Sequence, residues 1–152
     1  MPLLTHEMDL IQGFVAALKK HVRTQLRVAE LINANCNSRA FADVEFKSVS
    51  KIHWAIEAKS NLSPDKHNAA HKIFGELLKE TGRTNRKNCR HALLIPQDAV
   101  QFFSKKFQCV DRTKFVGFGK LIPINTVFTF GTAGIEQTTW LQLYDAYERK
   151  LG

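Results

Sequence analysis

Two neighbouring segments, residues 41–49 and 52–59, alternate hydrophobic with polar side chains, and this two-residue period predicts a pair of β-strands. A short link at 48–51 joins them, which favours a β-hairpin. Alternation along a strand sends successive side chains to opposite faces of the sheet. On the second strand one face is formed by Ile52, Trp54, Ile56 and Ala58, and the other by His53, Ala55, Glu57 and Lys59.

The rest of the chain predicts helices that alternate with strands. Hydrophobic residues recur every three or four positions from Asp9 to about Ala34, which indicates an amphipathic helix. Ser63 and Pro64 fit the start of a second helix, and Gly82 fits its end. Further helices are expected at 98–107 and 138–151, and further strands at 91–95, 114–118 and 126–130. Helical crossovers between the later strands indicate an α/β fold.

Length and charge narrow the class of protein. A chain of 152 residues with 44% hydrophobic side chains and no repeat or linker predicts a single domain over residues 1–152. Lys and Arg number 22 against 14 acidic residues, and the formal charge of +8 favours a polyanionic partner. No hydrophobic run approaches the roughly 20 residues of a membrane span, and no signal peptide is recognisable. Cys36, Cys89 and Cys109 lie far apart and are typical of reduced thiols, so we expect a cytoplasmic protein without membrane attachment.

Three residues carry the chemistry in this pattern. Glu57 and Lys59 lie two apart on a strand and share a face, and the hairpin can bring Asp43 beside them. Two carboxylates at close range repel each other unless a cation lies between them. Mg²⁺ prefers such oxygen ligands together with water and substrate phosphate oxygens. A lysine beside the metal can orient the attacking water or stabilise the charge on the phosphate.

Asp43, followed by Ile56-Glu57-Ala58-Lys59 on a strand, resembles the PD-(D/E)XK nuclease superfamily, the restriction-endonuclease-like fold of type II restriction enzymes and Holliday junction resolvases. The resemblance covers the chain from the first helix to about Ile95. It implies a central mixed sheet flanked by helices. It also implies that Asp43 and Glu57 bind the metal and that Lys59 assists the attacking water. The chain departs from the written motif in that Ala42 stands where the motif has proline.

Glu30, near the end of the first predicted helix, resembles the additional acid that some members of the superfamily contribute to the metal site. An alternative remains for the central three residues. Glu57 and Lys59 would then form an ion pair on a solvated strand face, and Asp43 would be a turn residue.

Glu45 and Lys47 share the predicted face of Asp43, so either side chain is within reach of the metal or the phosphate. Charges on an edge strand also prevent aggregation, and we favour that explanation. His53 lies on the face of Glu57, either as a partner of the site or as a strand residue only.

Basic residues are frequent in the connector 83–90, which follows the second predicted helix, and on that helix. The residues expected to contact the nucleic-acid backbone are Lys66, Arg83, Arg86, Lys87 and Arg90. The alternative for this segment is a solvated loop. His67 and His71 have a spacing that can hold a transition metal, but no third ligand follows at a recognisable distance. Surface histidines are therefore expected, with contact to phosphate as the alternative.

The sequence therefore predicts an Mg²⁺-dependent DNA endonuclease, with Mn²⁺ as a substitute metal. The alternatives are a non-catalytic nucleic-acid-binding or assembly module with the same fold, and an RNA nuclease. A homodimer is expected by resemblance, because cutting both strands of a duplex usually takes two sites. No phosphate-binding glycine motif or nucleophile elbow occurs, so no small-molecule cofactor is expected. The pattern leaves open which DNA structure or sequence is recognised.

Overall fold

The computed structural model describes residues 5–21, 23–38, 40–62, 66–83 and 88–148. Within these ranges six strands and the helices around them follow in chain order. The strands are β1 Val28–Ala34, β2 Val44–Ser48, β3 His53–Ala58, β4 Arg90–Pro96, β5 Thr126–Gly131 and β6 Gly134–Thr139. The helices are α1 Thr5–Lys19, α2 Lys66–Thr81, the short 3₁₀ turn η2 Gln97–Ala99, α3 Val100–Phe107, α4 Arg112–Leu121 and α5 Trp140–Asp145.

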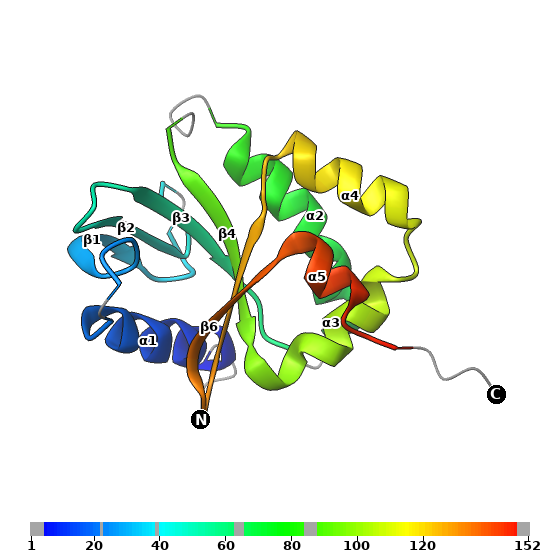
Figure 1. The fold of residues 1–152 in the computed structure, drawn as a ribbon, viewed down its shortest axis with the longest axis horizontal. Coiled ribbons are helices and arrows are strands. Elements are labelled where there is room, and N and C mark those ends of the chain that lie inside the picture. The colour runs from blue at the N-terminus through cyan, green and yellow to red at the C-terminus, as the bar shows by residue number, and fades with distance from the viewer. Residues whose placement is uncertain (1–4, 22, 39, 63–65, 84–87, 149–152) are drawn as a thin grey trace.

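All six strands form one mixed sheet in the order β1-β2-β3-β4-β5-β6. The β1–β2, β2–β3 and β5–β6 pairs are antiparallel, whereas β3–β4 and β4–β5 are parallel. Helix α2 connects β3 to β4, and η2, α3 and α4 connect β4 to β5. Helices α2 to α5 lie on one side of the sheet, while α1 lies on the other (Figure 1). The α/β class and the mixed sheet flanked by helices are therefore confirmed. Among the helices of the described ranges, none combines the length and hydrophobicity required to cross a bilayer.

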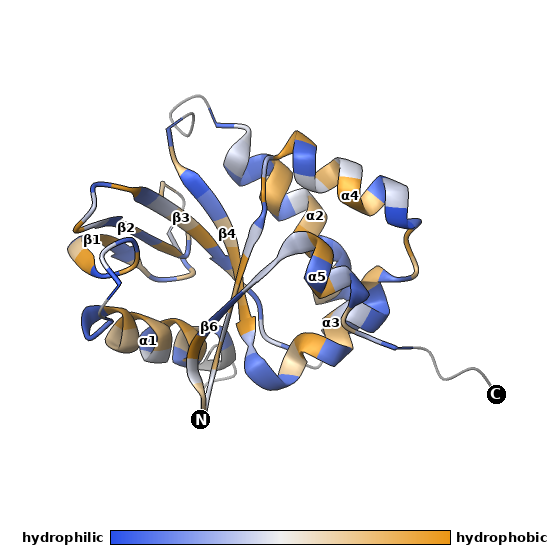
Figure 2. Cartoon of the chain, in the orientation of Figure 1, coloured by the Kyte–Doolittle hydropathy of each residue, from blue (hydrophilic) through white to orange (hydrophobic). Residues whose placement is uncertain are grey.

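Each face of the sheet has its own hydrophobic core. The core under α1 includes Phe14, Ile56 and Phe128, and the core under the other helices includes Leu77, Leu93 and Phe115. Strand β4 contributes to both, because its residues alternate between the two faces. Figure 2 shows hydrophobic residues along β4 beyond its polar start, as is usual for a central parallel strand covered on both sides.

The hairpin and the segments after it confirm most of the sequence-based expectations. In the antiparallel β2–β3 pair, Val44 faces Ile56 and Phe46 faces Trp54. The second helix ends at Thr81, and the Gly82 N–H donates to the Leu78 carbonyl at 3.0 Å. The expected strands at 91–95 and 126–130 and the helix at 98–107 correspond to β4, β5 and the η2–α3 segment. Ser63 and Pro64 lie outside the described residues.

The long first helix predicted from Asp9 to about Ala34 is wrong in its second half. The helix ends at Lys19, and residues Val28–Ala34 form β1. The pairing of β1 with β2 shifts register twice, between Val28 and Glu30 and between Leu31 and Asn33. Such irregularities break the two-residue alternation of a strand, so the sequence of β1 does not show a strand pattern.

Two predictions in the C-terminal part are also wrong. Residues 114–118, expected as a strand, lie in α4, whose first turn is capped by Asp111 accepting the Lys114 N–H at 3.2 Å. The helix predicted over 138–151 is α5 alone, because β6 occupies the residues before it. Thr139 and Gln142 form a capping box at the start of α5, which fixes the boundary between strand and helix.

Candidate active site

Asp43 comes directly before β2, and the backbone and strand β3 hold it in place. Its Oδ2 accepts the backbone N–H of Ala58 at 2.9 Å, and its carbonyl accepts the N–H of Asn35 at 3.0 Å. Because Val44 pairs with Ile56, the next position of the register brings Asp43 beside Glu57. The two carboxyl groups are hydrogen-bonded to each other. The hairpin therefore brings together the two acids that the sequence singled out.

The paired carboxyl groups share one proton near neutral pH. Burial, followed by the charge of Asp43 and the hydrogen bond between them, raises the pKa of Glu57 to about 9. Burial also raises the pKa of Asp43 to about 6, although the Ala58 N–H and the Glu57 hydrogen bond oppose this rise. Between these values Glu57 donates its proton to an ionised Asp43. Removing that proton places two negative charges side by side, which is the electrostatic condition that a divalent cation relieves.

Lys59 follows β3 and continues its pairing with β4, because its N–H donates to the Leu94 carbonyl at 2.9 Å. Its Nζ lies 2.7 Å from Oε1 of Glu76 on α2, and only 12% of its side chain is exposed. Burial works against the charged ammonium, but the hydrogen bond and charge of Glu76 outweigh it and raise the pKa of Lys59. The ammonium group is therefore held charged beside the two carboxyl groups.

Three further acids surround this site, and sequence reasoning missed all of them. The charges of Glu76 and Glu80, on α2, raise the pKa of Glu57. The charge of Glu7, on α1, raises the pKa of Asp43 and of Lys59. Glu7 lies in the first turn of the helix that the hydrophobic pattern placed from Asp9 onward, so an earlier helix start is the signal that would have included it.

A metal ion would find two protein carboxylates here. The described part of the chain contains no group of three or more His, Cys, Asp or Glu side chains arranged to hold a metal ion. Mg²⁺ is usually bound through one or two carboxylates, with water and substrate phosphate completing its shell. The hydrogen-bonded pair of Asp43 and Glu57 fits that donor set.

The placement of Glu30 on the first helix is wrong. Glu30 lies on β1, paired with Lys47 of β2, and 63% of its side chain is exposed. Its Oε2 is 4.0 Å from Nζ of Lys47. Lys47 is four residues along the chain from Asp43, a distance of about 13 Å at strand spacing, which is too far for a shared metal ion. The first-helix acid near the site is Glu7 instead.

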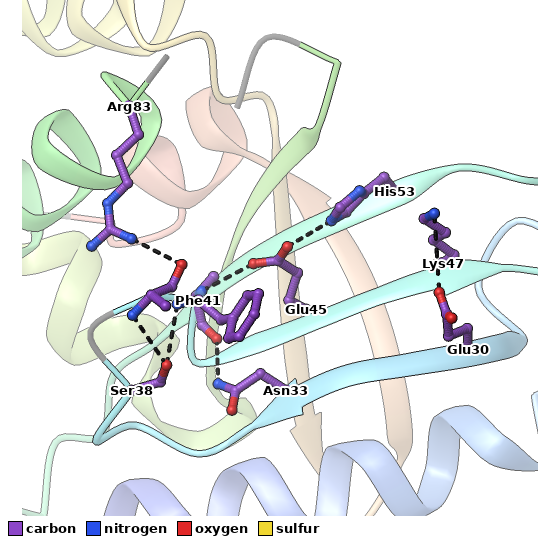
Figure 3. A network of polar contacts seen from close by, with 10 residues as sticks. Glu30, Asn33, Ser38, Phe41, Glu45, Lys47, His53 and Arg83 are labelled. Carbon is purple, nitrogen blue, oxygen red and sulfur yellow. Dashed lines mark hydrogen bonds and ion pairs between the residues drawn. The ribbon is translucent and has the colours of Figure 1, made fainter. Parts of the chain in front are cut away.

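The basic residues predicted to contact nucleic acid are only partly described. Arg83 lies 3.5 Å from Glu80 and donates to the Ala40 carbonyl at 3.1 Å (Figure 3). Arg90, the first residue of β4, is exposed and its guanidinium lies 5.5 Å from the centre of the Trp54 ring. The side chain of Lys66 and the whole of Arg86 and Lys87 lie outside the described residues.

Of the other polar residues considered in the sequence, the two histidines are exposed and Glu45 is buried. His67 and His71 are exposed on α2, and His67 packs near Phe102 with ring centres 5.6 Å apart. Glu45 is buried, contrary to its interpretation as a solvated edge charge, and its Oε2 lies 2.7 Å from Nε2 of His53 (Figure 3).

Because its pKa is raised, Glu57 makes the stability of the metal-free protein depend on pH. The carboxyl group contributes stability below its ordinary pKa of 4.5, and this contribution is lost as the pH rises through about 9. Glu57→Gln keeps a hydrogen-bond donor but cannot ionise. In EDTA we expect the melting temperature of Glu57→Gln, relative to the unaltered protein, to rise by roughly 5–10 °C between about pH 5 and about pH 8. Thermal unfolding across this pH range checks the difference, and a constant difference contradicts the raised pKa.

Comparison with protein-family models, with curated proteins and with solved structures found no match for this chain. The interpretation of the site therefore depends on its own residues: a buried carboxyl pair that shares a proton, with a charged lysine beside it on the same face of the sheet.

Proposed function

We propose that this protein is a metal-dependent nuclease that hydrolyses phosphodiester bonds in DNA. The observation that carries the proposal is the buried, hydrogen-bonded pair of Asp43 and Glu57, whose pKa values lie at about 6 and about 9. A pair that resists losing its second proton has a strong electrostatic preference for a divalent cation. The formal charge of +8 suits a polyanionic substrate.

In the proposed reaction Asp43 and Glu57 hold the metal ion through their carboxylate oxygens. Bound Mg²⁺, or Mn²⁺ in its place, supplies a Lewis acid that polarises the phosphate and lowers the pKa of a bound water. Lys59 keeps its positive charge because Glu76 lies 2.7 Å away, so its role is to orient the attacking water and to offset charge on the phosphate. Attack in line with the leaving oxygen requires no covalent intermediate on the protein.

Glu7 is the further acid that we assign to this site in place of Glu30. It comes from α1, on the opposite side of the sheet from Glu76, and its charge reaches both Asp43 and Lys59. A carboxylate whose charge acts on the site strengthens its attraction for a cation, even when that carboxylate binds the cation through water. A homodimer with one site on each strand of a duplex is part of the same proposal.

The test is incubation of the purified protein with supercoiled plasmid and with a branched DNA, in Mg²⁺, Mn²⁺ or EDTA. We expect cleavage with either metal, none in EDTA, and none with Glu57→Gln. The matched control is Glu136→Gln, which alters an exposed glutamate on β6, a strand that β4 and β5 separate from the site. Cleavage that survives Glu57→Gln shows that the site lies elsewhere. Competition with RNA of the same sequence shows whether the protein is a DNA nuclease or an RNA nuclease.

One observation favours a second candidate, a nucleic-acid-binding module that does not cut. The ammonium group of Lys59 is already paired with Glu76 at 2.7 Å, which leaves it less able to contact water or phosphate. Such a protein would bind DNA with a strong dependence on salt concentration and would show no hydrolysis with any metal. The same incubation, combined with a binding measurement in EDTA, distinguishes the two.

A further inference from the structure

The chain that leads into Asp43 is held by a buried carboxylate two residues further on. Oε1 of Glu45 accepts the backbone N–H of Ala42 at 3.1 Å, and its Oε2 lies 2.7 Å from Nε2 of His53 (Figure 3). Only 2% of the Glu45 side chain is exposed. One side chain therefore ties the Phe41–Ala42 peptide to strand β3.

The next peptide, between Ala42 and Asp43, is held by β1. Asn33 donates from Nδ2 to the Ala42 carbonyl at 2.7 Å and to the Asn35 carbonyl at 2.9 Å. Arg83, two residues after the end of α2, donates to the Ala40 carbonyl at 3.1 Å and so holds the Ala40–Phe41 peptide (Figure 3). Contacts from β1, from β2 and from the segment after α2 thus converge on the short segment that precedes Asp43.

Burying a carboxylate costs free energy that a hydrophobic residue at the same position would not cost. The neighbouring positions on β2 are occupied by hydrophobic residues, Val44 and Phe46, which are both fully buried. The Glu45 carboxylate is turned toward the Ala42 N–H rather than toward solvent. Its contacts therefore point to the backbone that sets the place of Asp43.

We propose that Glu45 is a positioning residue for the metal site, which acts by fixing the Phe41–Ala42 peptide directly before Asp43 and through it the Asp43 carboxylate. This inference rests on the proposed function. Residues that orient metal ligands typically change metal affinity or activity about 10- to 100-fold when they are removed. A peptide released from Glu45 can rotate and carry the Asp43 carboxylate away from Glu57, which weakens the shared cation site.

The experiment compares two replacements of Glu45 by Mn²⁺ titration calorimetry. Glu45→Gln keeps an oxygen that can accept the Ala42 N–H and an amide that can donate to His53, so its Mn²⁺ affinity should stay within about threefold of the unaltered protein. Glu45→Ala removes both contacts and should weaken Mn²⁺ binding about 10- to 100-fold. Cleavage by Glu45→Ala should need correspondingly more metal for half-maximal rate, with the rate largely regained at saturating Mn²⁺. The control is Glu136→Ala, which removes a glutamate bound by Gln97 at 2.7 Å on β6.

A second variant keeps the test valid if Glu45→Ala fails to fold. Asn33→Ala releases the Ala42 carbonyl from a half-buried position of β1, and it should weaken Mn²⁺ binding in the same direction. Unchanged Mn²⁺ affinity in both alanine variants overturns the proposal. Equal losses of Mn²⁺ affinity in Glu45→Gln and Glu45→Ala also overturn it, because the negative charge of Glu45 would then matter rather than its hydrogen bond to the Ala42 N–H. If the unaltered protein binds no Mn²⁺, the proposed function itself is wrong.

Discussion

Asp43→Asn is expected to lower metal-dependent DNA cleavage by more than about 1,000-fold, because it removes a carboxylate that the proposed reaction needs in its transition state. The amide oxygen of asparagine can still accept the Ala58 N–H, the contact that Oδ2 of Asp43 makes at 2.9 Å. The fold should therefore persist. Cleavage rate over a range of Mg²⁺ concentrations, with thermal unfolding of the same preparation, checks both parts.

Glu30→Gln is the matched control for this loss. Its carboxylate is exposed on β1 and lies 4.0 Å from Lys47, well away from Asp43 along the strand. Cleavage by Glu30→Gln should equal that of the unaltered protein. A loss of cleavage in Glu30→Gln comparable to that of Asp43→Asn would contradict the placement of the site at the start of β2.

The second large effect concerns stability rather than chemistry. Phe115 of α4 is fully buried, and its ring stacks on Trp140 with centres 4.2 Å apart and planes at 4°. The Trp140 indole N–H also donates to the Phe115 carbonyl at 2.8 Å. Phe115→Ala should cost about 3–5 kcal/mol of unfolding free energy, through lost burial and the cavity left behind. For a chain of this length the melting temperature should fall by about 6–20 °C.

Leu121→Ala, at the end of the same helix, is the control for this change. The Leu121 side chain is exposed by 72%, so its truncation should alter the unfolding free energy by less than about 0.5 kcal/mol. Urea unfolding of both variants at one pH gives the comparison. If Phe115→Ala and Leu121→Ala unfold alike, the hydrophobic core on the side of α2 to α5 does not depend on the stacking of Phe115 on Trp140.

The hairpin could be predicted because its two-residue alternation is uninterrupted. That alternation fixes which residues face each other, so the meeting of Asp43 with Glu57 followed from sequence alone. The central strand β4 was equally clear, since a strand buried on both faces is a continuous hydrophobic run.

Elements whose pattern is set by distant contacts could not be predicted in the same way. Strand β1 carries two register shifts, which erase its alternation. The aromatic residues of α4 suit a strand by propensity, but stacking of Phe115 on Trp140 holds that segment as a helix.

Distant contacts also place the acids near the site that the sequence did not single out. Glu7 and Glu76 belong to α1 and α2, and nothing in their local sequence indicates which residues of the sheet they approach. Packing of the helices on opposite faces of the sheet brings their charges to Asp43, Glu57 and Lys59. The ion pair of Lys59 with Glu76 therefore could not be predicted from the sequence.

The most direct test of a metal site at the shared-proton pair is the number of protons released when Mn²⁺ binds. Near pH 7.5 the pair holds one proton, because the pKa of Asp43 is about 6 and that of Glu57 about 9. Calorimetric titration in buffers of different ionisation enthalpy should show Mn²⁺ binding with release of about one proton per ion, and Glu57→Gln should release none. No Mn²⁺ binding, or binding without proton release, would contradict the site described for Asp43 and Glu57.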